Sequence, residues 1–262
     1  MSYPQSEIFN RTELLFGEER MKNLKDKKVI IFGIGGVGSW TAEALVRTGI
    51  INLTIVDADK VAVSNINRQV PATTETIGKI KTDAMRQHLL SINPEANITA
   101  INSIYSAATQ HLFHLEEYDY IVDAIDSLSD KALLIYNATR ARKPKLFASM
   151  GAALKIDPTR VKVTEFSKVT GCRLAAALRR RFKKSGFYPA RKFKCVYSDE
   201  LLPNITAEKS PAPLQNSAQN TTPLPMTFNK VATNGSLCHI TAIFGMTLAG
   251  LILEDIYKET AS

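Results

Sequence analysis

Val29-Ile-Ile-Phe-Gly-Ile-Gly-Gly-Val-Gly-Ser39 is the stretch that decides the fold of this chain. A β-branched run enters a cluster of glycines, and a helical pattern leaves it over residues 39–47. A second apolar run, Leu53-Thr-Ile-Val-Asp57, ends in an acid. This order predicts a strand, a phosphate-binding loop, a helix and a second strand whose acid reaches a ribose.

The glycines of this stretch have distinct tasks in such a loop. Gly33 allows a tight turn, Gly35 lets backbone N–H groups approach a phosphate, and Gly38 lets the helix pack close to the sheet. The free N–H groups and the helix dipole both favour an anion there. A glycine cluster alone is a weak signal whose default interpretation is NAD binding, so the downstream residues have to decide the ligand.

Composition limits the class of protein. With 262 residues, of which 45% are hydrophobic, the chain is long enough for one large α/β domain with or without an appendage. Cys172, Cys195 and Cys238 form no C-x-x-C pair, which argues against a disulfide scaffold and a four-cysteine zinc site. The first residues show neither a basic start nor an apolar stretch, so we expect no signal peptide and a cytoplasmic location.

Strand and helix patterns alternate through the first part of the chain. This alternation predicts an α/β, Rossmann-like, doubly wound and mostly parallel sheet. We assign 1–157 to a nucleotide-binding domain and 158–262 to an extension of the same structural domain, in which 160–166 is an added strand. Strands are predicted at 29–32, 53–56, 98–101, 120–125 and 145–150, and helices at 39–47, 82–92 and 131–142.

The end of the sequence holds a polar stretch and an apolar one. Residues 210–234 are rich in Pro, Ser, Thr, Asn and Gln, which predicts a mobile loop. Residues 237–253 are slightly short for a membrane span and include His239 and Thr241, so a buried closing helix is the better interpretation. We expect no stable membrane insertion, while a peripheral membrane contact stays open.

The polar residues that follow the strands carry the chemistry. Ligands bind at the carboxyl edge of an open α/β sheet. Asp57 lies 19 positions after Gly38, where an acid accepts hydrogen bonds from ribose hydroxyls. The residues after Asp57 that we expect to face the nucleotide are Asp59, Ser64, Asn65, Asn67 and Arg68.

Two further residues complete the expected site. Lys81 opens the next predicted helix, where its ammonium group can reach a phosphate. Asp126 ends another strand at the same edge and can hold Mg²⁺. A solvated lysine at a helix start and an aspartate that caps a helix are the simpler alternatives. Two cations and a metal ligand suit an adenylating enzyme better than a hydride-transfer enzyme, because negative charge builds at the α-phosphate.

The net charge of +8 is unevenly placed. Residues 167–198 contain no Asp or Glu and ten basic residues, so the remainder carries 8 − 10 = −2. Aromatic residues, among them Phe182, Phe187, Tyr188 and Phe193, interrupt the basic run, which favours a polyanion partner over a merely solvated face. The basic residues are Lys168, Arg173, Arg179, Arg180, Arg181, Lys183, Lys184, Arg191, Lys192 and Lys194.

The chain resembles the ubiquitin-activating-enzyme-like adenylyltransferases, and among them the tRNA threonylcarbamoyladenosine dehydratases. The resemblance is specific over residues 9–157 and looser beyond, and 210–234 match nothing in that family. It rests on Arg11-Thr-Glu-Leu-Leu-Phe-Gly17, Phe32-Gly-Ile-Gly-Gly-Val-Gly-Ser-Trp40, Glu43-Ala-Leu-Val-Arg-Thr-Gly49, Asn65-Ile-Asn-Arg-Gln69 and Asp123-Ala-Ile-Asp126.

This resemblance implies an activity and its residues. ATP would adenylate the carboxylate of N6-threonylcarbamoyladenosine beside the tRNA anticodon, and the ureido group would then close a ring with net loss of water. Gly36 would contact the nucleotide, and Asp126 with Ser127 would lie near the metal. Arg68, Lys81 and Asp126 would be catalytic together with Arg11, which would reach the neighbouring subunit's site in a homodimer. The basic segment would be the tRNA surface.

Alternatives remain at this point. The first is activation of a ubiquitin-like sulfur-carrier tail, although such relatives usually carry two C-x-x-C zinc pairs. The second is an NAD-dependent oxidoreductase, which Arg68 and Lys81 disfavour. The third is a non-catalytic RNA-binding or sulfur-transfer scaffold that has kept a nucleotide pocket. A sulfur-transfer partner for Cys172 or Cys238 and a site for a monovalent cation also stay open.

Overall fold

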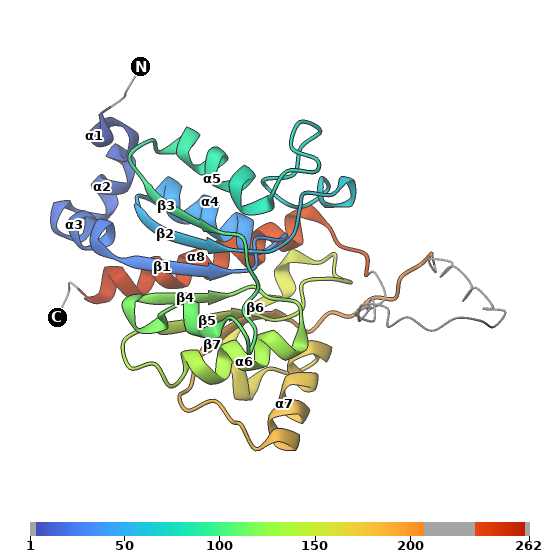
Figure 1. The fold of residues 1–262 in the computed structure, drawn as a ribbon. Helices are drawn as coiled ribbons and strands as arrows, with labels where there is room; N and C mark the ends of the chain where they lie inside the picture. Colours follow the sequence, from blue (N-terminus) through green and yellow to red (C-terminus); the bar gives the residue numbers. More distant parts are fainter. Residues whose placement is uncertain (1–3, 207–233, 260–262) are drawn as a thin grey trace.

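A single seven-stranded sheet forms the centre of the computed structural model, which describes residues 4–206 and 234–259 (Figure 1). Its strand order is β3-β2-β1-β4-β5-β7-β6, with every neighbouring pair parallel except β6 and β7. This confirms the predicted fold class and the added strand. The strands are β1 (Lys28–Phe32), β2 (Asn52–Val56), β3 (Asn97–Ile101), β4 (Tyr120–Asp123), β5 (Lys145–Ser149), β6 (Val161–Glu165) and β7 (Lys194–Ser198).

Helices cover both faces of the sheet. Side chains alternate along a strand, so Val29 and Ile31 of β1 pack into one apolar cluster, and Ile30 and Phe32 pack into another. The first cluster includes residues of α4, α5 and α8, and the second includes residues of α6 and α7. The helices are α1 (Gln5–Ile8), α2 (Asn10–Phe16), α3 (Glu18–Asp26), α4 (Gly38–Thr48), α5 (Lys81–Ile92), α6 (Leu128–Ala138), α7 (Arg173–Ser185) and α8 (Cys238–Glu259).

The closing helix is α8, and it packs against α4. The Thr41 hydroxyl of α4 donates a hydrogen bond of 3.2 Å to the Gly245 carbonyl oxygen of α8. Ile240, Phe244 and Leu248 are fully buried in the same contact. By length and composition α8 is apolar enough to cross a membrane, but half of its apolar window is buried inside the structure, as expected of a core helix.

The observed boundaries differ from the predicted ones by one residue at several elements and by more in β4, α6 and α8, the last of which runs to Glu259. β4 ends at Asp123 rather than 125, because the Asp123 carboxylate accepts a hydrogen bond from the Ile125 N–H and turns the chain. α6 begins at Leu128 and ends at Ala138, earlier than expected at both ends. The sequence patterns did not predict α1 to α3, α7 or β7. The predicted mobile loop lies outside the described residues except for Asn234.

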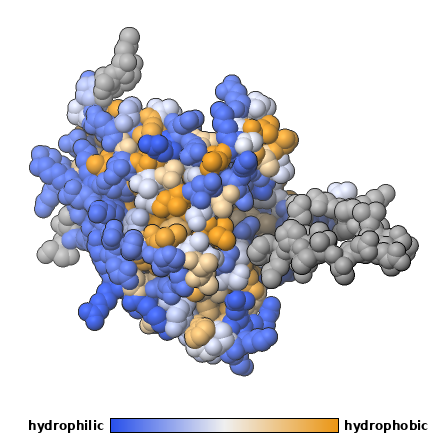
Figure 2. All heavy atoms as spheres, viewed as in Figure 1, coloured by the Kyte–Doolittle hydropathy of each residue, from blue (hydrophilic) through white to orange (hydrophobic). Residues whose placement is uncertain are grey.

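The strand order reverses at one point of the carboxyl edge of the sheet. The chain leaves β1 for β2 and β3 on one side, and β4 lies on the other side, so the strand order reverses at β1 and β4. Nucleotides bind outside the carboxyl ends of the strands at such a point. The opposite edge, where both described ends of the chain lie, is hydrophilic in Figure 2 and includes ion pairs from Lys145 to Asp255 (2.6 Å) and Glu259 (3.1 Å).

The division predicted at residue 157 does not divide the sheet. β6 and β7 come from the second part of the sequence, yet β7 pairs with β5 and continues the sheet. The helix α8 covers α4 and contacts β5 in the same way. The nucleotide-binding part and the extension therefore share one core.

Candidate nucleotide-binding site

The phosphate loop connects β1 to α4 and has no room for side chains at two positions. Gly33 has a φ of +89°, and a Cβ there would lie 2.6 Å from the Ala124 carbonyl oxygen. A Cβ at Gly38 would lie 1.8 Å from the carbonyl oxygen of Gly33. The tight turn and the close approach of helix and strand therefore both require glycine, as predicted.

Asp57 connects the end of β2 to this loop. One of its carboxylate oxygens accepts a hydrogen bond of 2.7 Å from the Ile34 N–H, and the other accepts one of 2.9 Å from the Asp59 N–H. Its side chain is 9% exposed, whereas that of Asp59 is 77% exposed. Asp57 thus lies directly beside the phosphate loop, and its predicted ribose contact stays a prediction.

Lys81 joins the two carboxylates from the start of α5. Its side chain is 3% exposed, and its ammonium nitrogen lies 2.9 Å from Asp59 Oδ2 and 3.3 Å from Asp57 Oδ1. A buried cation beside a phosphate loop raises the local positive potential, which favours a polyphosphate. The structure brings Lys81 to the same edge as Asp57, and its predicted phosphate contact stays a prediction.

Arg68 lies against the phosphate loop. Its Cγ would be 3.3 Å from a Cβ added at Gly36, and its backbone carbonyl oxygen accepts a hydrogen bond of 3.1 Å from the Trp40 indole. The guanidinium group donates to the Ser64 carbonyl oxygen and to Asn67 Oδ1, both at 2.8 Å. These bonds hold the guanidinium group next to the loop.

The two asparagines of this segment have backbone partners. Asn65 Oδ1 accepts a hydrogen bond of 3.1 Å from the Ala62 N–H, and Asn67 Nδ2 donates one of 3.0 Å to the Ser236 carbonyl oxygen. They shape the turn that presents Arg68. Gly35 lies near Gln69, whose amide nitrogen would be 3.8 Å from a Cβ added at Gly35.

Asp126 and Ser127 follow the turn after β4. The N-cap position of α6 is Ser127, so Asp126 lies outside the helix and does not cap it. Asp126 is exposed at the carboxyl edge. Within residues 4–206 and 234–259, no three His, Cys, Asp or Glu side chains group to hold a metal ion, so a metal here would depend on oxygens of the nucleotide as well.

A buried ion pair fixes the turn that carries Asp126. Asp123 and Lys131 are both 0% exposed, and their charged groups lie 2.9 Å apart. Lys131 also donates a hydrogen bond of 3.1 Å to the Ile125 carbonyl oxygen. Burial raises the pKa of Asp123, and the Lys131 ammonium group opposes that effect. We did not predict this pair from the sequence. Asp123, an acid inside an apolar run, was the signal that could have indicated it.

The start of α8 packs against the phosphate loop. A Cβ at Gly36 would lie 3.1 Å from Thr241 Cβ, so the first turn of α8 packs on the phosphate loop. His239 Nε2 lies 2.9 Å from the Ile156 carbonyl oxygen, and the Leu154 N–H donates a hydrogen bond of 2.9 Å to the Gly235 carbonyl oxygen. The chain after β5 therefore positions α8. Sequence reasoning did not assign Thr241 or Ser236 to the site.

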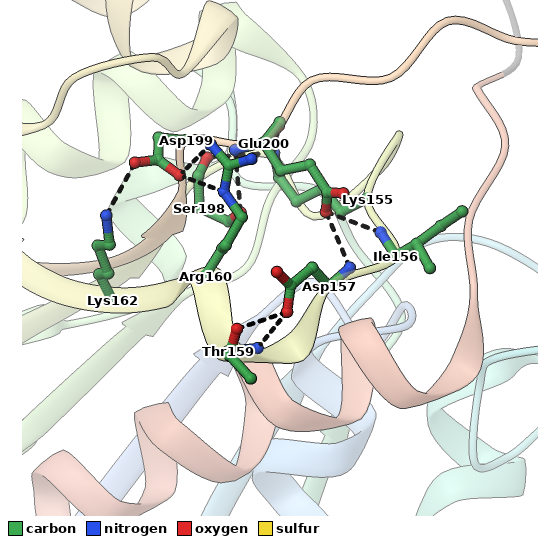
Figure 3. A network of polar contacts seen from close by, with 9 residues as sticks. All are labelled: Lys155, Ile156, Asp157, Thr159, Arg160, Lys162, Ser198, Asp199 and Glu200. Atoms are coloured by element: carbon green, nitrogen blue, oxygen red, sulfur yellow. Dashed lines mark hydrogen bonds and ion pairs between the residues drawn. The ribbon is translucent and has the colours of Figure 1, made fainter.

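A polar network in turn holds that chain segment against the end of β7 (Figure 3). Buried Lys155 donates hydrogen bonds to the carbonyl oxygens of Ser198 and Glu200, and burial lowers its pKa. The Glu200 carboxylate accepts hydrogen bonds from the N–H groups of Ile156 (2.8 Å) and Asp157 (3.0 Å). These contacts are structural, because each one fastens backbone to backbone through a side chain.

Arg11 lies far from this site in its own chain. It is exposed on α2, between α1 and α3 at the opposite edge of the sheet (Figure 1). Leu14 and Leu15 on the same helix are 81% and 73% exposed. One copy of the chain therefore does not bring Arg11 to its own nucleotide site.

Two arginines of the basic segment are bound to backbone carbonyl oxygens. Arg191 donates hydrogen bonds to carbonyls between α6 and β5, among them those of Thr139 (3.0 Å) and Pro144 (3.0 Å). Arg179 donates one to the Val169 carbonyl oxygen. These two have structural partners, which weakens the prediction that they bind nucleic acid. The other residues that we predicted to bind nucleic acid are exposed, namely Arg173, Arg180, Arg181, Lys183, Lys184, Lys192 and Lys194.

A phosphate loop at the switch point, with an acid, an arginine and a lysine around it, defines a nucleotide-binding α/β protein of the adenylating type. The chain belongs to the ThiF family, whose profile matches residues 9–258.

The relatives of this chain narrow the class further. The chain is 34% identical over 97% of its length to tRNA threonylcarbamoyladenosine dehydratase of Escherichia coli, of which it covers 94%. It is 32% identical to the enzyme of that name from Bacillus subtilis, with 96% of this chain and 95% of that one covered. The crystal structure of the E. coli dehydratase in complex with ATP superposes with a TM-score of 0.82, 32% identity and coverage of 99% and 98%. The resemblance predicted from the sequence is confirmed.

Proposed function

We propose that this protein is an ATP-dependent tRNA threonylcarbamoyladenosine dehydratase. The observation that carries the proposal is similarity along the whole chain, including the basic extension, at 97% coverage. The molybdopterin-synthase adenylyltransferase of E. coli, a sulfur-carrier-activating alternative, is 31% identical but matches only 57% of this chain. The extension thus favours a tRNA substrate over a protein tail.

The residues of the carboxyl edge would carry the adenylation step. Asp57 binds the ribose, and the N–H groups of Gly35 and Gly36 receive the phosphates. Arg68 and Lys81 stabilise the negative charge that builds at the α-phosphate when the substrate carboxylate attacks and pyrophosphate leaves. Lys81 exchanges its contact with exposed Asp59 for the phosphate. These roles rest on the distances above and on the carboxyl-edge position that all five share.

Mg²⁺ fits at Asp126. Magnesium is usually held by one or two carboxylates and by substrate phosphates, and Asp126 is an exposed carboxylate at the correct edge. When bound, the ion neutralises charge on the leaving pyrophosphate. The Asp123–Lys131 pair fixes the backbone on which Asp126 stands.

Ring closure needs orientation more than a protein nucleophile. The ureido nitrogen and the activated carbonyl belong to one side chain, so holding them in contact converts the reaction into an intramolecular one. AMP leaves with the former carboxylate oxygen, and the net change is the loss of one water. Burial raises the pKa of Cys195, which makes that thiol unreactive and agrees with a closure that uses no cysteine.

The partners follow from the surface. tRNA binds along the exposed basic side of α7, in the cytoplasm. A second copy of the chain would bring Arg11 to the neighbouring nucleotide site, because exposed Leu14 and Leu15 beside Arg11 offer apolar surface for a homodimer contact.

Mass spectrometry of tRNA nucleosides tests the proposed function. Purified protein is incubated with ATP, Mg²⁺ and tRNA that bears threonylcarbamoyladenosine, and the nucleosides are extracted under mild conditions. We expect a product lighter by one water that requires ATP, and we expect none with Arg68→Ala. If competent tRNA is unchanged while ATP binds, the function is instead the activation of a protein tail.

A further inference from the structure

A hollow of about 510 Å³ lies beside the end of α7. Its volume falls in the range of small-molecule sites, about 300–1,000 Å³. Nothing in the proposed adenylation chemistry uses it, because it lies at the opposite edge of the sheet from the phosphate loop. Six of the residues that line it carry the argument: Phe166, Phe182, Lys183, Tyr188, Lys192 and Phe193.

Aromatic rings are among the side chains that line this hollow. Phe166 stacks on Phe193 with 5.2 Å between ring centres and 13° between planes, and it meets Phe182 edge to face at 5.9 Å. These three rings are buried and rigid, so they cannot themselves present an exposed stacking face as the sequence pattern suggested. Tyr188 is different, because 53% of it is exposed beside the opening.

Positive charge surrounds the opening. Lys183 is exposed near the end of α7, and the Lys192 side chain is 81% exposed. The one acid that lines the hollow is Glu165, whose carboxylate lies 3.8 Å from the Lys192 ammonium nitrogen. An apolar, aromatic interior with a basic rim matches a nucleotide, whose base is flat and apolar on its faces and whose phosphates are anionic.

The helix α7 connects this hollow to the active edge. Cys172, just before α7, lies near Gly151 at the carboxyl end of β5, whereas Phe182 packs beside the end of β6. With 13 residues, α7 is about 20 Å long. A nucleic acid that lies along its exposed basic side therefore passes from the carboxyl edge of the sheet to the hollow.

We infer that the hollow receives an unstacked nucleobase of the bound tRNA, different from the base that is modified, and that Lys183 and Lys192 hold the adjoining phosphates. The inference rests on the proposed function, because it assumes a tRNA substrate. It adds a second contact that anchors the tRNA about one helix length from the chemistry.

Two variants separate stacking from charge. Tyr188→Ala removes the stacking face but keeps the Tyr188 carbonyl oxygen, which accepts a hydrogen bond from Arg140. We expect it to weaken tRNA binding about 5- to 150-fold without changing the salt dependence. Lys183→Ala is expected to lower the slope of log affinity against log salt by about 0.7 for a single-stranded contact. Lys22→Ala on α3, also an exposed lysine, is the matched control and should change neither.

Heparin, a polyanion without bases, is the second probe. Tyr188→Ala should bind heparin as the unchanged protein does, and Lys183→Ala should bind it more weakly. Unchanged tRNA affinity in Tyr188→Ala overturns the inference, as does an equal loss of heparin and tRNA binding. The dehydration assay on the unchanged protein keeps the two proposals apart, because a lighter product together with an unaffected Tyr188→Ala leaves the proposed function standing and removes only the nucleobase site.

Discussion

Lys81 and Lys131 occupy similar places in the fold and differ in what surrounds them. Each lies in the first turn of a helix at the carboxyl edge, each is almost fully buried, and each pairs with an aspartate at the end of a strand. Lys131 has a partner, Asp123, that is as buried as itself. Lys81 shares its charge with Asp59, which is 77% exposed.

This difference is what we expect between a structural pair and the pair that has a part in the proposed chemistry. A cation whose only carboxylate partner is buried cannot release it without leaving an unpaired charge inside the protein. A cation with an exposed second partner can exchange that partner for an incoming phosphate, because water solvates the released carboxylate. We call Asp123 with Lys131 the closed pair, and it holds the backbone around Asp126. We call Lys81 with Asp57 and Asp59 the open pair, and it is available for the proposed chemistry.

The largest expected effect is on the closed pair. Lys131→Met leaves Asp123 buried without its cation, so we expect a loss of about 3–5 kcal/mol in the free energy of unfolding. Urea denaturation measures it. The double variant Lys131→Met with Asp123→Leu removes both charges and should recover most of the loss. A single variant as stable as the unchanged protein would contradict a buried, paired Asp123.

The open pair should respond in activity more than in stability. Lys81→Met is expected to reduce ATP–pyrophosphate exchange by about 10²-fold or more, because the proposed function makes Lys81 a cation at the α-phosphate. Circular dichroism and urea denaturation serve as controls, and we expect them to show a folded protein. If the exchange rate stays normal, Lys81 is a structural residue like Lys131 and the comparison fails.

Glu43 is intermediate between the closed and the open pair, and it makes the stability of the protein depend on pH. Glu43 of α4 is buried, but its partners Arg47 and His88 have side chains 56% and 37% exposed. Burial alone raises the pKa of Glu43, yet the hydrogen bonds from His88 and Arg47 outweigh it and hold the pKa below its ordinary value of 4.5.

We therefore expect Glu43→Gln to cost about 1–2 kcal/mol near neutral pH. A carboxylate with a lowered pKa stabilises the folded state above the unfolded pKa and loses this contribution as the pH falls through the folded pKa. The stability difference between the two proteins should accordingly shrink below about pH 4.5. Thermal unfolding across this range measures it, and a difference that stays constant would show that the ionised form of Glu43 has no part.

The smallest expected effect is at Asp59, the exposed carboxylate of the open pair. Asp59→Ala keeps the Asp57–Lys81 contact, so the free energy of unfolding should change by less than about 0.5 kcal/mol. Urea denaturation in parallel with Lys131→Met makes the comparison direct. A loss of similar size in both variants would mean that Asp59 is not the releasable partner.

The sequence predicted the parts of the site that depend on local spacing. Gly33, Gly38 and Asp57 lie where they do because a strand, a tight turn and a helix of ordinary lengths leave little choice. Such reasoning does not extend to side chains that meet through the tertiary fold. Lys131 in a helical pattern is typical of a solvated residue, and only the neighbouring strand shows that it is buried.

The basic segment shows the same limit of prediction from sequence. Arg191 and Arg180 are both exposed, and a count of charges cannot show that the Arg191 guanidinium group is bound to backbone carbonyl oxygens that follow α6. The aromatic residues divide in the same way, since Phe182 and Phe193 are 3% and 6% exposed while Phe187 is 60% exposed. Composition identified the surface, but packing decides which of its residues a partner can reach.

The packing of α8 on α4 has a consequence for how the protein folds. Thr41 and Gly245, which form a hydrogen bond between these helices, are 204 positions apart in the chain. Contacts at such separations form late, because closing a long loop costs entropy before any contact rewards it. We therefore expect the phosphate loop, whose residues are close neighbours in sequence, to gain its support from α8 late in folding. The recovery of ATP binding during refolding would report completion of the whole molecule.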